Sequence, residues 1–343
     1  MARVYYFEEP VQKHAVGDFD GDGVDEAVID FGAPGIWMWN GGAWSQLSTS
    51  NPENMVPFDI DGNGDDEIAA DLGSLGLWMW NGGVWSQLSA NNAEYLIAVD
   101  TNNNGLEELS IDFGAGGLRW RQESGYLFGM TPYDPQNIIA VDVDNNGNDE
   151  VIADFGTIGA WLWTASGPAW NQLTSADPNT MVAVDAFGFG NEGVAAGLGA
   201  VGTWLWDSGM WAQLSGVFAD RVISGRMIWG GGEEIAGDFG SLGLWLWSSS
   251  VWSQLSGVNA ESMIAADVDG NGIDEAAVDF ELLGLWLWNS GVWTQLSGVN
   301  PEGLLAGDID GDSALELIVD FGGLGLWLWN GGTWSQISAL NPD

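Results

Sequence analysis

Hydrophobic and polar positions alternate in short runs along this chain, and the same order of runs returns about every 41 residues. In the second repeat the alternation predicts four strands, at 54–58, 67–72, 76–80 and 84–88. Gly73-Ser74-Leu75 separates the middle two strands. Asn81-Gly82-Gly83 is typical of a tight hairpin, because Asn and Gly tolerate positive φ. Each repeat therefore predicts four antiparallel strands.

Eight such repeats account for nearly the whole chain. They start near Asp18, Asp59, Asp100, Asp142, Asp185, Ser224, Asp267 and Asp308. Four strands in about 40 to 45 residues is the size of a propeller blade. We therefore predict an all-β fold, a single eight-bladed β-propeller domain over residues 1–343. A linear solenoid is the alternative, but neither terminal repeat resembles the polar cap that it would need.

The two ends of the chain predict how the first and last repeats meet. Residues 334–343 resemble the linker that precedes every first strand, and the strand that should follow lies around residues 14–17. The ends are thus expected to meet in phase, with a complete blade on each side. Residues 1–9 fall outside the repeat and are expected to brace that junction.

A nine-residue acidic phrase, first seen as Asp18-Phe19-Asp20-Gly21-Asp22-Gly23-Val24-Asp25-Glu26, opens six of the repeats. Calcium takes six to eight oxygen ligands, and acids at positions 1, 3 and 5 allow a tight loop to wrap one ion. Glycine at position 6 permits the turn, position 7 offers a main-chain carbonyl, and Glu at position 9 closes the shell. The predicted ligands are Asp18, Asp20, Asp22, Val24 and Glu26; Asp59, Asp61, Asn63, Asp65 and Glu67; Asp100, Asn102, Asn104, Leu106 and Glu108; Asp142, Asp144, Asn146, Asn148 and Glu150; Asp267, Asp269, Asn271, Ile273 and Glu275; and Asp308, Asp310, Asp312, Ala314 and Glu316.

Other interpretations of these loops fit less well. An EF-hand needs Glu at position 12, where the first two loops have Ile29 and Ala70, and strand follows instead of helix. Magnesium prefers a rigid octahedron that keeps several waters. Acidic turns that only solvate the rim remain the alternative without a metal. The last loop has Ser313 at the glycine position, and the fifth and sixth repeats lack the acidic phrase, so we interpret those two as structural units.

The phrase Asp-Phe-Asp-Gly-Asp-Gly-x-x-Glu, followed by a strand, resembles the FG-GAP/VCBS repeat of integrin-type β-propellers and bacterial surface proteins. The resemblance implies that each loop joins the first and second strands of a blade and binds Ca²⁺, at about six sites in this chain. It implies no single function, because one fold hosts many functions. Two departures are visible: Glu stands at position 9 where the family usually has Asp, and Asp30-Phe31-Gly32 replaces the usual Gly-Ala-Pro tail.

Seven repeats carry a Trp-x-Trp pair and a third Trp, and Trp120 and Trp229 complete the 23 tryptophans. Period-two geometry places both indoles of a pair on one face of a strand, where they pack against the next blade. The alternative is that the indoles are stacking platforms for sugars. The expected acceptors of the indole N–H groups are Asp30, Asp71, Asp112, Asp154, Asp238, Asp279 and Asp320.

The charge narrows the choice of partners. With 49 acidic and 6 basic residues the net charge is −43, which excludes nucleic acid and anionic membranes, since both need a basic surface. No cysteine is present, so disulfides and thiolate chemistry are excluded. No apolar run reaches the length of a membrane span, and the start lacks the apolar core of a signal peptide.

Four of the five arginines lie in the irregular third and sixth repeats: Arg119, Arg121, Arg221 and Arg226. One interpretation is that each guanidinium stacks on neighbouring aromatics beside an acidic partner. The other is a ligand or partner site for an anionic group.

These observations predict a calcium-stabilised binding propeller, extracellular or at a cell surface, that recognises carbohydrate or a partner protein. A self-assembling building block of a surface layer or filament, and hence a homo-oligomer, is the first alternative. A polysaccharide lyase or hydrolase is the second, through a carboxylate pair among the many acids. We expect no enzyme, because basic groups are scarce and the lone histidine, His14, lies in a predicted strand.

Overall fold

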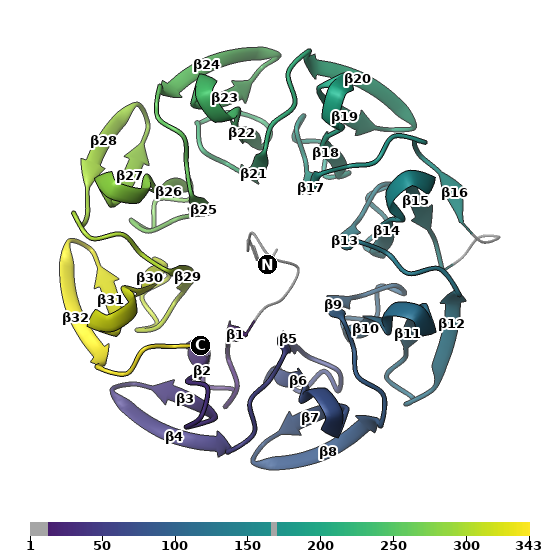
Figure 1. The fold of residues 1–343 in the computed structure, drawn as a ribbon, viewed down its shortest axis with the longest axis vertical. Helices are drawn as coiled ribbons and strands as arrows, with labels where there is room; N and C mark the ends of the chain where they lie inside the picture. Colours follow the sequence, from purple (N-terminus) through teal and green to yellow (C-terminus); the bar gives the residue numbers. More distant parts are fainter. Residues whose placement is uncertain (1–12, 166–169) are drawn as a thin grey trace. The chain divides into compact units, whose positions relative to one another are not determined.

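The computed structural model describes residues 13–165 and 170–343, which form eight four-stranded sheets (Figure 1). Within each sheet the strands are hydrogen-bonded in chain order, and the fold is an eight-bladed, all-β propeller as predicted. Contacts divide the described chain into unit 1, Ile138–Leu304, and unit 2, residues 13–137 with Leu305–Asp343. The single domain stays a prediction, and residues 1–9 lie outside the described residues.

Unit 2 contains the first three blades and most of the last one. Blade 1 has β1 (His14–Gly17), β2 (Glu26–Asp30), β3 (Ile36–Asn40) and β4 (Ala43–Ser48); blade 2 has β5 (Asn54–Phe58), β6 (Glu67–Asp71), β7 (Leu77–Asn81) and β8 (Val84–Ser89); blade 3 has β9 (Tyr95–Val99), β10 (Glu108–Asp112), β11 (Leu118–Arg121) and β12 (Leu127–Thr131). Blade 8 has β29 (Gly303–Gly307), β30 (Glu316–Asp320), β31 (Leu326–Asn330) and β32 (Thr333–Ser338), and the boundary between the units falls within β29.

Unit 1 contains blades 4 to 7. Blade 4 has β13 (Asn137–Val141), β14 (Glu150–Asp154), β15 (Ala160–Trp163) and β16 (Asn171–Gln172); blade 5 has β17 (Thr180–Val184), β18 (Gly193–Gly197), β19 (Thr203–Asp207) and β20 (Met210–Ser215). Blade 6 has β21 (Arg221–Gly225), β22 (Glu234–Asp238), β23 (Leu244–Ser248) and β24 (Val251–Ser256); blade 7 has β25 (Ser262–Ala266), β26 (Glu275–Asp279), β27 (Leu285–Asn289) and β28 (Val292–Gln295).

One short 3-10 turn follows the second strand in blades 2 to 8. The turns are η1 (Gly73–Leu75), η2 (Gly114–Gly116), η3 (Gly156–Ile158), η4 (Gly199–Val201), η5 (Gly240–Leu242), η6 (Glu281–Leu283) and η7 (Gly322–Leu324). Among the described residues, no helix is long and apolar enough to cross a membrane.

Blade 2 shows how the sequence sets the register. β5 pairs with β6 from Asn54 opposite Asp71 to Phe58 opposite Glu67. β7 and β8 are joined by Gly82 and Gly83, which have φ of +51° and +95°. Because L side chains rarely adopt this left-handed region, the two glycines permit the predicted hairpin.

The second strand of every blade is buried at all five positions, and its side chains alternate between two blade interfaces. In β6, Ile68 and Ala70 join a cluster with Val28 of blade 1. Ala69 joins a different cluster, with Leu109 of blade 3. This alternation follows from the period of a strand, in which successive side chains point to opposite faces. The hydrophobic core therefore lies between blades.

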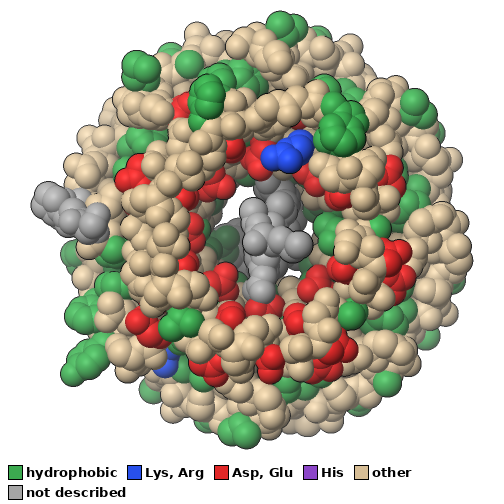
Figure 2. Space-filling model, turned by 180° about the vertical axis from the view of Figure 1, so that it is seen from behind, with side chains coloured by type: hydrophobic (Ala, Val, Ile, Leu, Met, Phe, Trp, Pro, Cys, Tyr) green, Lys and Arg blue, Asp and Glu red, His purple; other side chains and the backbone are tan. Residues whose placement is uncertain are grey.

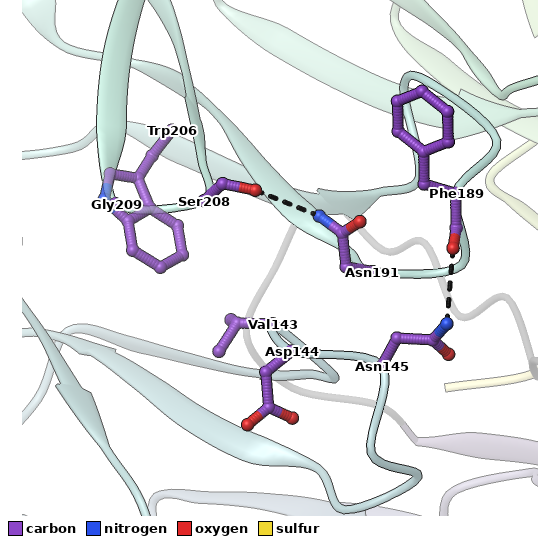
Figure 3. Close-up of a pocket in the computed structure, with 8 residues that line it drawn as sticks. All are labelled: Val143, Asp144, Asn145, Phe189, Asn191, Trp206, Ser208 and Gly209. Carbon is purple, nitrogen blue, oxygen red and sulfur yellow. Dashed lines mark hydrogen bonds between the residues drawn. The ribbon is translucent and has the colours of Figure 1, made fainter.

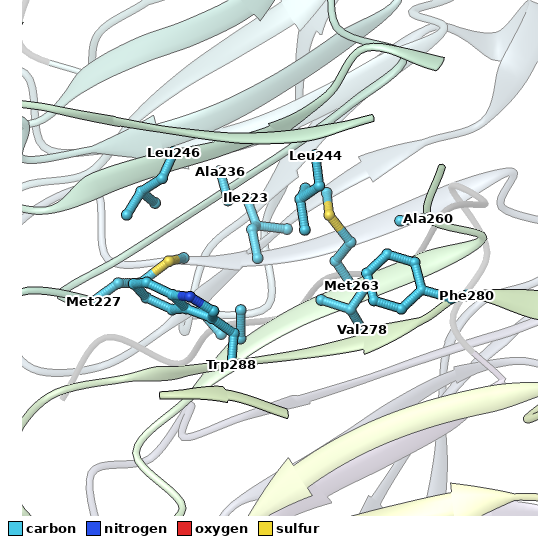
Figure 4. Close-up of a cluster of buried hydrophobic side chains, with 12 residues drawn as sticks. Ile223, Met227, Ala236, Leu244, Leu246, Ala260, Met263, Val278, Phe280 and Trp288 are labelled. Carbon is cyan, nitrogen blue, oxygen red and sulfur yellow. The ribbon is translucent and has the colours of Figure 1, made fainter. Parts of the chain in front are cut away.

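The interface between blades 6 and 7 is built in the same way (Figure 4). Ile223 and Leu246 of blade 6 lie in one cluster with Met263 and Trp288 of blade 7. Met227, which directly follows the start of the blade 6 loop, is also in this cluster and is 0% exposed.

The tryptophans of one triplet have different roles. The second Trp is buried in the core, as Trp39 and Trp80 show, and it faces the third Trp across the strand pair. The first and third are half-buried. The N–H of the first donates to the carbonyl three residues earlier, as from Trp78 to Leu75 at 2.9 Å. The third donates to the preceding blade, as from Trp85 to Leu47 at 2.9 Å.

The expected carboxylate acceptors for these indoles were therefore wrong. The acceptors in the hydrogen bonds above are main-chain carbonyls. The aspartates at the end of the second strand instead accept the N–H two residues later, as Asp71 does from Gly73 at 3.2 Å. The same bond forms in the other six blades with this Asp, at Asp30, Asp112, Asp154, Asp238, Asp279 and Asp320. These carboxylates hold the turn that leads into the third strand.

Blades 8 and 1 meet within unit 2, as the matching chain ends predict. The N–H of Asp343 donates to the carbonyl of Asp30 at 3.0 Å, and the Lys13 ammonium lies 3.0 Å from the Asp343 carboxylate. Trp44 of blade 1 donates to the carbonyl of Ile337 at 2.8 Å. Burial lowers the pKa of His14 to about 4, and its Nδ1 accepts the N–H of Asp30 at 3.2 Å. His14 thus supports the strand pair.

Candidate metal centres in the blade loops

Each acidic loop connects the first and second strands of its blade. In blade 1, β1 ends at Gly17, the loop begins at Asp18, and Glu26 is the first residue of β2. The other five acidic loops lie at the same place, as both the repeat and the family resemblance imply.

The carboxylate at position 1 organises the loop backbone. Asp18 accepts the N–H groups of Gly21 at 2.7 Å, Asp22 at 3.1 Å and Gly23 at 2.8 Å. The equivalent aspartates of the other five acidic loops each accept the N–H of position 6 and that of position 4 or 5. Gly23 at position 6 has φ of +87°, and Ser313 adopts +74° at the same position of the last loop, so this loop takes the turn without glycine.

The side chains at positions 3 and 5 also point toward their own loop. Asp20 accepts the N–H of Asp22 at 3.2 Å, and Asp22 accepts the N–H of Val24 at 2.9 Å. Asp20 further accepts Nδ2 of Asn40, which ends β3, at 2.8 Å. Equivalent amides reach position 3 from Asn81, Asn289 and Asn330, a contribution that the sequence analysis missed.

The structure brings several of the predicted ligands close together. In each of four loops, three acidic residues have oxygens within 4.8 Å of one another: Asp18, Asp20 and Asp22; Asp59, Asp61 and Glu67; Asp142, Asp144 and Glu150; and Asp267, Asp269 and Glu275. Glu94, Asp112 and Asp134 form a further acidic group that the sequence analysis did not predict, at the opposite end of β9 and β10 from their loop.

The Glu at position 9 is the buried member of each loop. Its Oε2 accepts the N–H of position 2, as Glu26 does from Phe19 at 2.8 Å and Glu275 from Val268 at 3.0 Å. Burial, followed by repulsion from loop carboxylates, raises the pKa of Glu26 and Glu275 to about 7. The same cause, burial first, raises the pKa of Glu67, Glu108, Glu150 and Glu316 to about 7.

The donor set fits a hard divalent cation. Glu275 is 1% exposed, and its Oε1 has no hydrogen-bond partner among the described residues. A buried carboxylate oxygen without a partner costs free energy. A bound Ca²⁺ would be a partner for this oxygen, because Ca²⁺ is a hard cation that binds carboxylate, carbonyl and water oxygens.

The acid at position 8, which the sequence analysis overlooked, clamps neighbouring blades together. Asp66 of blade 2 accepts the N–H of Asp18 at 3.1 Å, and its own N–H donates to the Asp18 carbonyl at 2.6 Å. The same two-way contact joins Asp59 to Glu107, Asp142 to Glu192, Asp185 to Glu233, Arg226 to Asp274 and Asp308 to Asp25. In the acidic loops the residue at position 1 thus belongs to the candidate ligand group and to a blade interface at once.

The clamp also corrects the alignment of the sixth repeat. Arg226, and not Ser224, makes the contacts of position 1, while Ser224 lies inside β21. The loop therefore runs from Arg226 to Glu234, with no acid before Glu233. The sequence alignment slipped by two residues because no aspartate marks the start of this loop.

The four arginines lie in two different blades, two in blade 3 and two in blade 6. In blade 3, Arg119 takes the place of the first Trp and donates to the Gly116 carbonyl at 3.0 Å, the carbonyl position that the indole uses elsewhere. Arg121 replaces the second Trp; burial lowers its pKa, and its Nη1 has no hydrogen-bond partner within the described chain. In blade 6, Arg221 lies 3.7 Å from the Asp238 carboxylate, as the interpretation with an acidic partner expects, whereas the side chain of Arg226 is exposed.

A pocket of about 580 Å³ lies beside the loops of blades 4 and 5 (Figure 3). Its lining includes Asp144 and Asn145 from blade 4 and Asn191 and Trp206 from blade 5. Asn145 donates to the Phe189 carbonyl at 3.2 Å, and Asn191 donates to Asp207 at 2.9 Å. The pocket combines amide and carboxylate groups with an aromatic wall.

No family model matches the chain, and no curated protein matches it in sequence. Solved structures do resemble it. BBS1N, in complex with ARL6DN and soaked with mercury, is 12% identical with a TM-score of 0.55, over 99% of this chain and 98% of that one. A lectin from Agrocybe aegerita, in a structure concerning specific recognition of non-reducing terminal N-acetylglucosamine, is 14% identical with a TM-score of 0.57, over 97% and 94%. At these identities the likeness shows the propeller fold.

Proposed function

We propose that this chain is a calcium-stabilised binding propeller of the FG-GAP/VCBS type that works outside the cell. The observation that supports calcium best is the buried, unpartnered Oε1 of Glu275 beside Asp267 and Asp269. Six divalent ions would offset about twelve of the 43 net negative charges. The chain's own part is to hold the Asp, Asn and Glu side chains at positions 1, 3, 5 and 9 in a loop that its backbone already closes.

The calcium proposal is tested by metal content and thermal melting. Metal-free protein is dialysed against calcium or magnesium, and bound metal is measured by elemental analysis. We expect about six calcium ions per chain and a higher melting temperature with calcium, since a ligand at 100 times its Kd adds about 2.7 kcal/mol for each independent site. Equal melting with and without calcium, together with no retained metal, would reject it.

The ligand is carbohydrate or a partner protein. The pocket beside blades 4 and 5 supports a sugar, because polar groups that fix orientation beside an apolar wall are the usual composition of small-molecule sites. A glycan array probed with the calcium-loaded chain tests this. Binding that is lost on Asn191→Ala, with folding retained, supports carbohydrate, and an array without signal argues for a protein partner.

Self-assembly is the second candidate, and one observation favours it. The outer strands β4, β8 and β24 are six residues long and contain no charged residue or proline. Proteins usually protect an exposed edge with such residues, because an unpaired edge can add a strand from another chain. Sedimentation velocity with and without calcium tests this, and a monomer at all concentrations in both would exclude it.

A further inference from the structure

The loops of blades 5 and 6 keep the hydrogen bonds of the acidic loops although neither has Asp or Asn at positions 3 and 5. Asp185 at position 1 accepts the N–H groups of Phe189 at 3.1 Å and Gly190 at 2.9 Å, as the acidic loops do. In blade 6, Glu234 at position 9 accepts the N–H of Met227 at 2.9 Å. The backbone path is therefore maintained without the side chains at positions 3 and 5 that would hold a metal.

Large apolar side chains project from these two loops. Phe189 is 77% exposed, Trp229 76%, Phe187 46% and Ile228 38%, and these four residues are called the aromatic patch. Met227 in the same stretch is fully buried, so the exposure is confined to the outward positions. Large exposed apolar side chains gathered in two neighbouring loops are typical of an interaction site.

Close backbone packing fixes the two loops to each other. A Cβ on Gly188 would lie 1.0 Å from the carbonyl oxygen of Gly231, and a Cβ on Gly232 would lie 2.6 Å from that of Ala186. Phe187 stacks on Phe189 with ring centroids 6.5 Å apart, and its ring meets Trp247 edge-on at 6.5 Å. The aromatic patch is thus preorganised, which lowers the entropic cost of binding.

The charge around the aromatic patch is unlike that of the other loops. In the first seven positions of both loops the only acid is Asp185, whose carboxylate is engaged by its own backbone. Arg226 places an exposed guanidinium at the edge, where it interacts electrostatically with Glu233 at position 8 and with Asp274 of blade 7. The chain otherwise has 49 acids against 6 basic residues, and acidic side chains gather in many groups on the face seen in Figure 2. An anionic group on a ligand is therefore accommodated here and repelled at the acidic loops.

We propose that the aromatic patch and Arg226 dock a segment of a partner protein that presents a large apolar side chain next to a carboxylate. Trp and Arg are the residue types that dominate the binding energy of protein interfaces. The four patch side chains carry only one hydrogen-bonding group, the indole N–H, and Phe189 is the member that also lines the pocket beside the loops of blades 4 and 5. The docking site rests on the proposed binding function and specifies its partner.

The test uses the full chain and a phage-displayed library of random 12-residue peptides. Enriched peptides are synthesised, and their affinity is measured by fluorescence polarisation. Phe189→Ser and Trp229→Ser remove the aromatic patch at its most exposed positions. Leu282→Ser is the matched control, because Leu282 is 94% exposed on η6 of blade 7, outside the patch. Arg226→Gln is measured with each peptide and with its Asp→Asn or Glu→Gln form.

We expect enriched peptides to contain a large apolar residue beside Asp or Glu, and the two patch variants to weaken binding at least about tenfold, as interface hot spots do. Leu282→Ser should bind as the parent does, and Arg226→Gln should weaken only the carboxylate peptides. Failure to enrich any peptide, equal binding by the patch variants, or glycan binding that Trp229→Ser abolishes would overturn the proposal. The peptide assay is repeated on folded metal-free protein so that the docking proposal and the calcium proposal can fail separately. If the peptides bind but calcium does not change the melting temperature, only the calcium proposal is rejected.

Discussion

Replacing Glu275 by Gln should change stability in opposite directions with and without calcium. The carboxyl is 1% exposed, and burial first, then Asp269 and the other loop acids, raise its pKa to about 7 from 4.5. Because one pKa unit corresponds to about 1.4 kcal/mol, ionised Glu275 costs the metal-free fold up to about 3 kcal/mol at pH 8. Gln keeps an acceptor for the Val268 N–H and removes that charge.

With calcium the balance shifts toward the parent chain. At 100 times the Kd, the parent gains about 2.7 kcal/mol from this site, and Glu275→Gln gains nothing there. In metal-free buffer at pH 8, denaturant unfolding should therefore give the variant a higher free energy of unfolding than the parent. Adding calcium should raise the free energy of unfolding of the parent by about 2.7 kcal/mol more than that of the variant. Bound calcium should fall by one ion per chain. A variant that keeps the parent's calcium content, or that is destabilised equally in both buffers, would refute the assignment of Glu275 as a ligand.

Three further predictions concern the frame around the loops. Asp66→Ala should lower the free energy of unfolding by about 1.5–3 kcal/mol, because it removes a charged acceptor from the Asp18 N–H, whereas exposed Glu302→Ala should not; equal denaturant midpoints would contradict this. Metal-free protein should lose stability as the pH rises from 5 to 8, because burial raises the pKa of Asp71, Asp112 and Asp154 to about 7 in the folded state. The folded state therefore favours the protonated carboxyls, and this contribution to stability is lost as the pH rises through 7. An unfolding free energy that stays constant or increases over this pH range would contradict the prediction. Trp85→Phe should cost about 1 kcal/mol by removing the donor to Leu47, and thermal melting of Trp85→Phe beside Trp44→Phe, the equivalent position in blade 1, checks whether the loss recurs.

The fold was predictable because every repeat has the same order of hydrophobic runs and turn residues. In blade 2, alternation and the Gly82-Gly83 turn predicted four strands to within one residue at each end. The clamp was not predictable in this way. Asp66 stands next to Glu67 and looks like ordinary surface charge, while its partner is a main-chain N–H 48 residues earlier, which no side-chain pattern reveals.

The same reason explains the other differences. The indoles were assigned carboxylate acceptors because recurring aspartates are visible in the sequence, but main-chain carbonyls are present at every position and leave no signature. In the sixth repeat the clamp uses only the main chain of Arg226, so the aspartate that marks position 1 elsewhere is dispensable there. The contacts within one loop were predicted from its own side chains, whereas main-chain partners and side chains from distant segments, such as Asn40, were missed.

The clamps bear on what calcium does for this propeller. The carboxylate of Asp18 accepts N–H groups of its own loop, and its main-chain N–H donates to Asp66 of the next blade. An ion bound in this loop would therefore also stabilise the interface between the two blades. Blades 5 and 6 form the same clamp, through Asp185 and Glu233, although neither loop has Asp or Asn at positions 3 and 5. Packing between blades therefore does not require a metal at every loop. Calcium would instead relieve the buried charge at position 9, and its loss should loosen the six acidic loops more than the two that carry the aromatic patch.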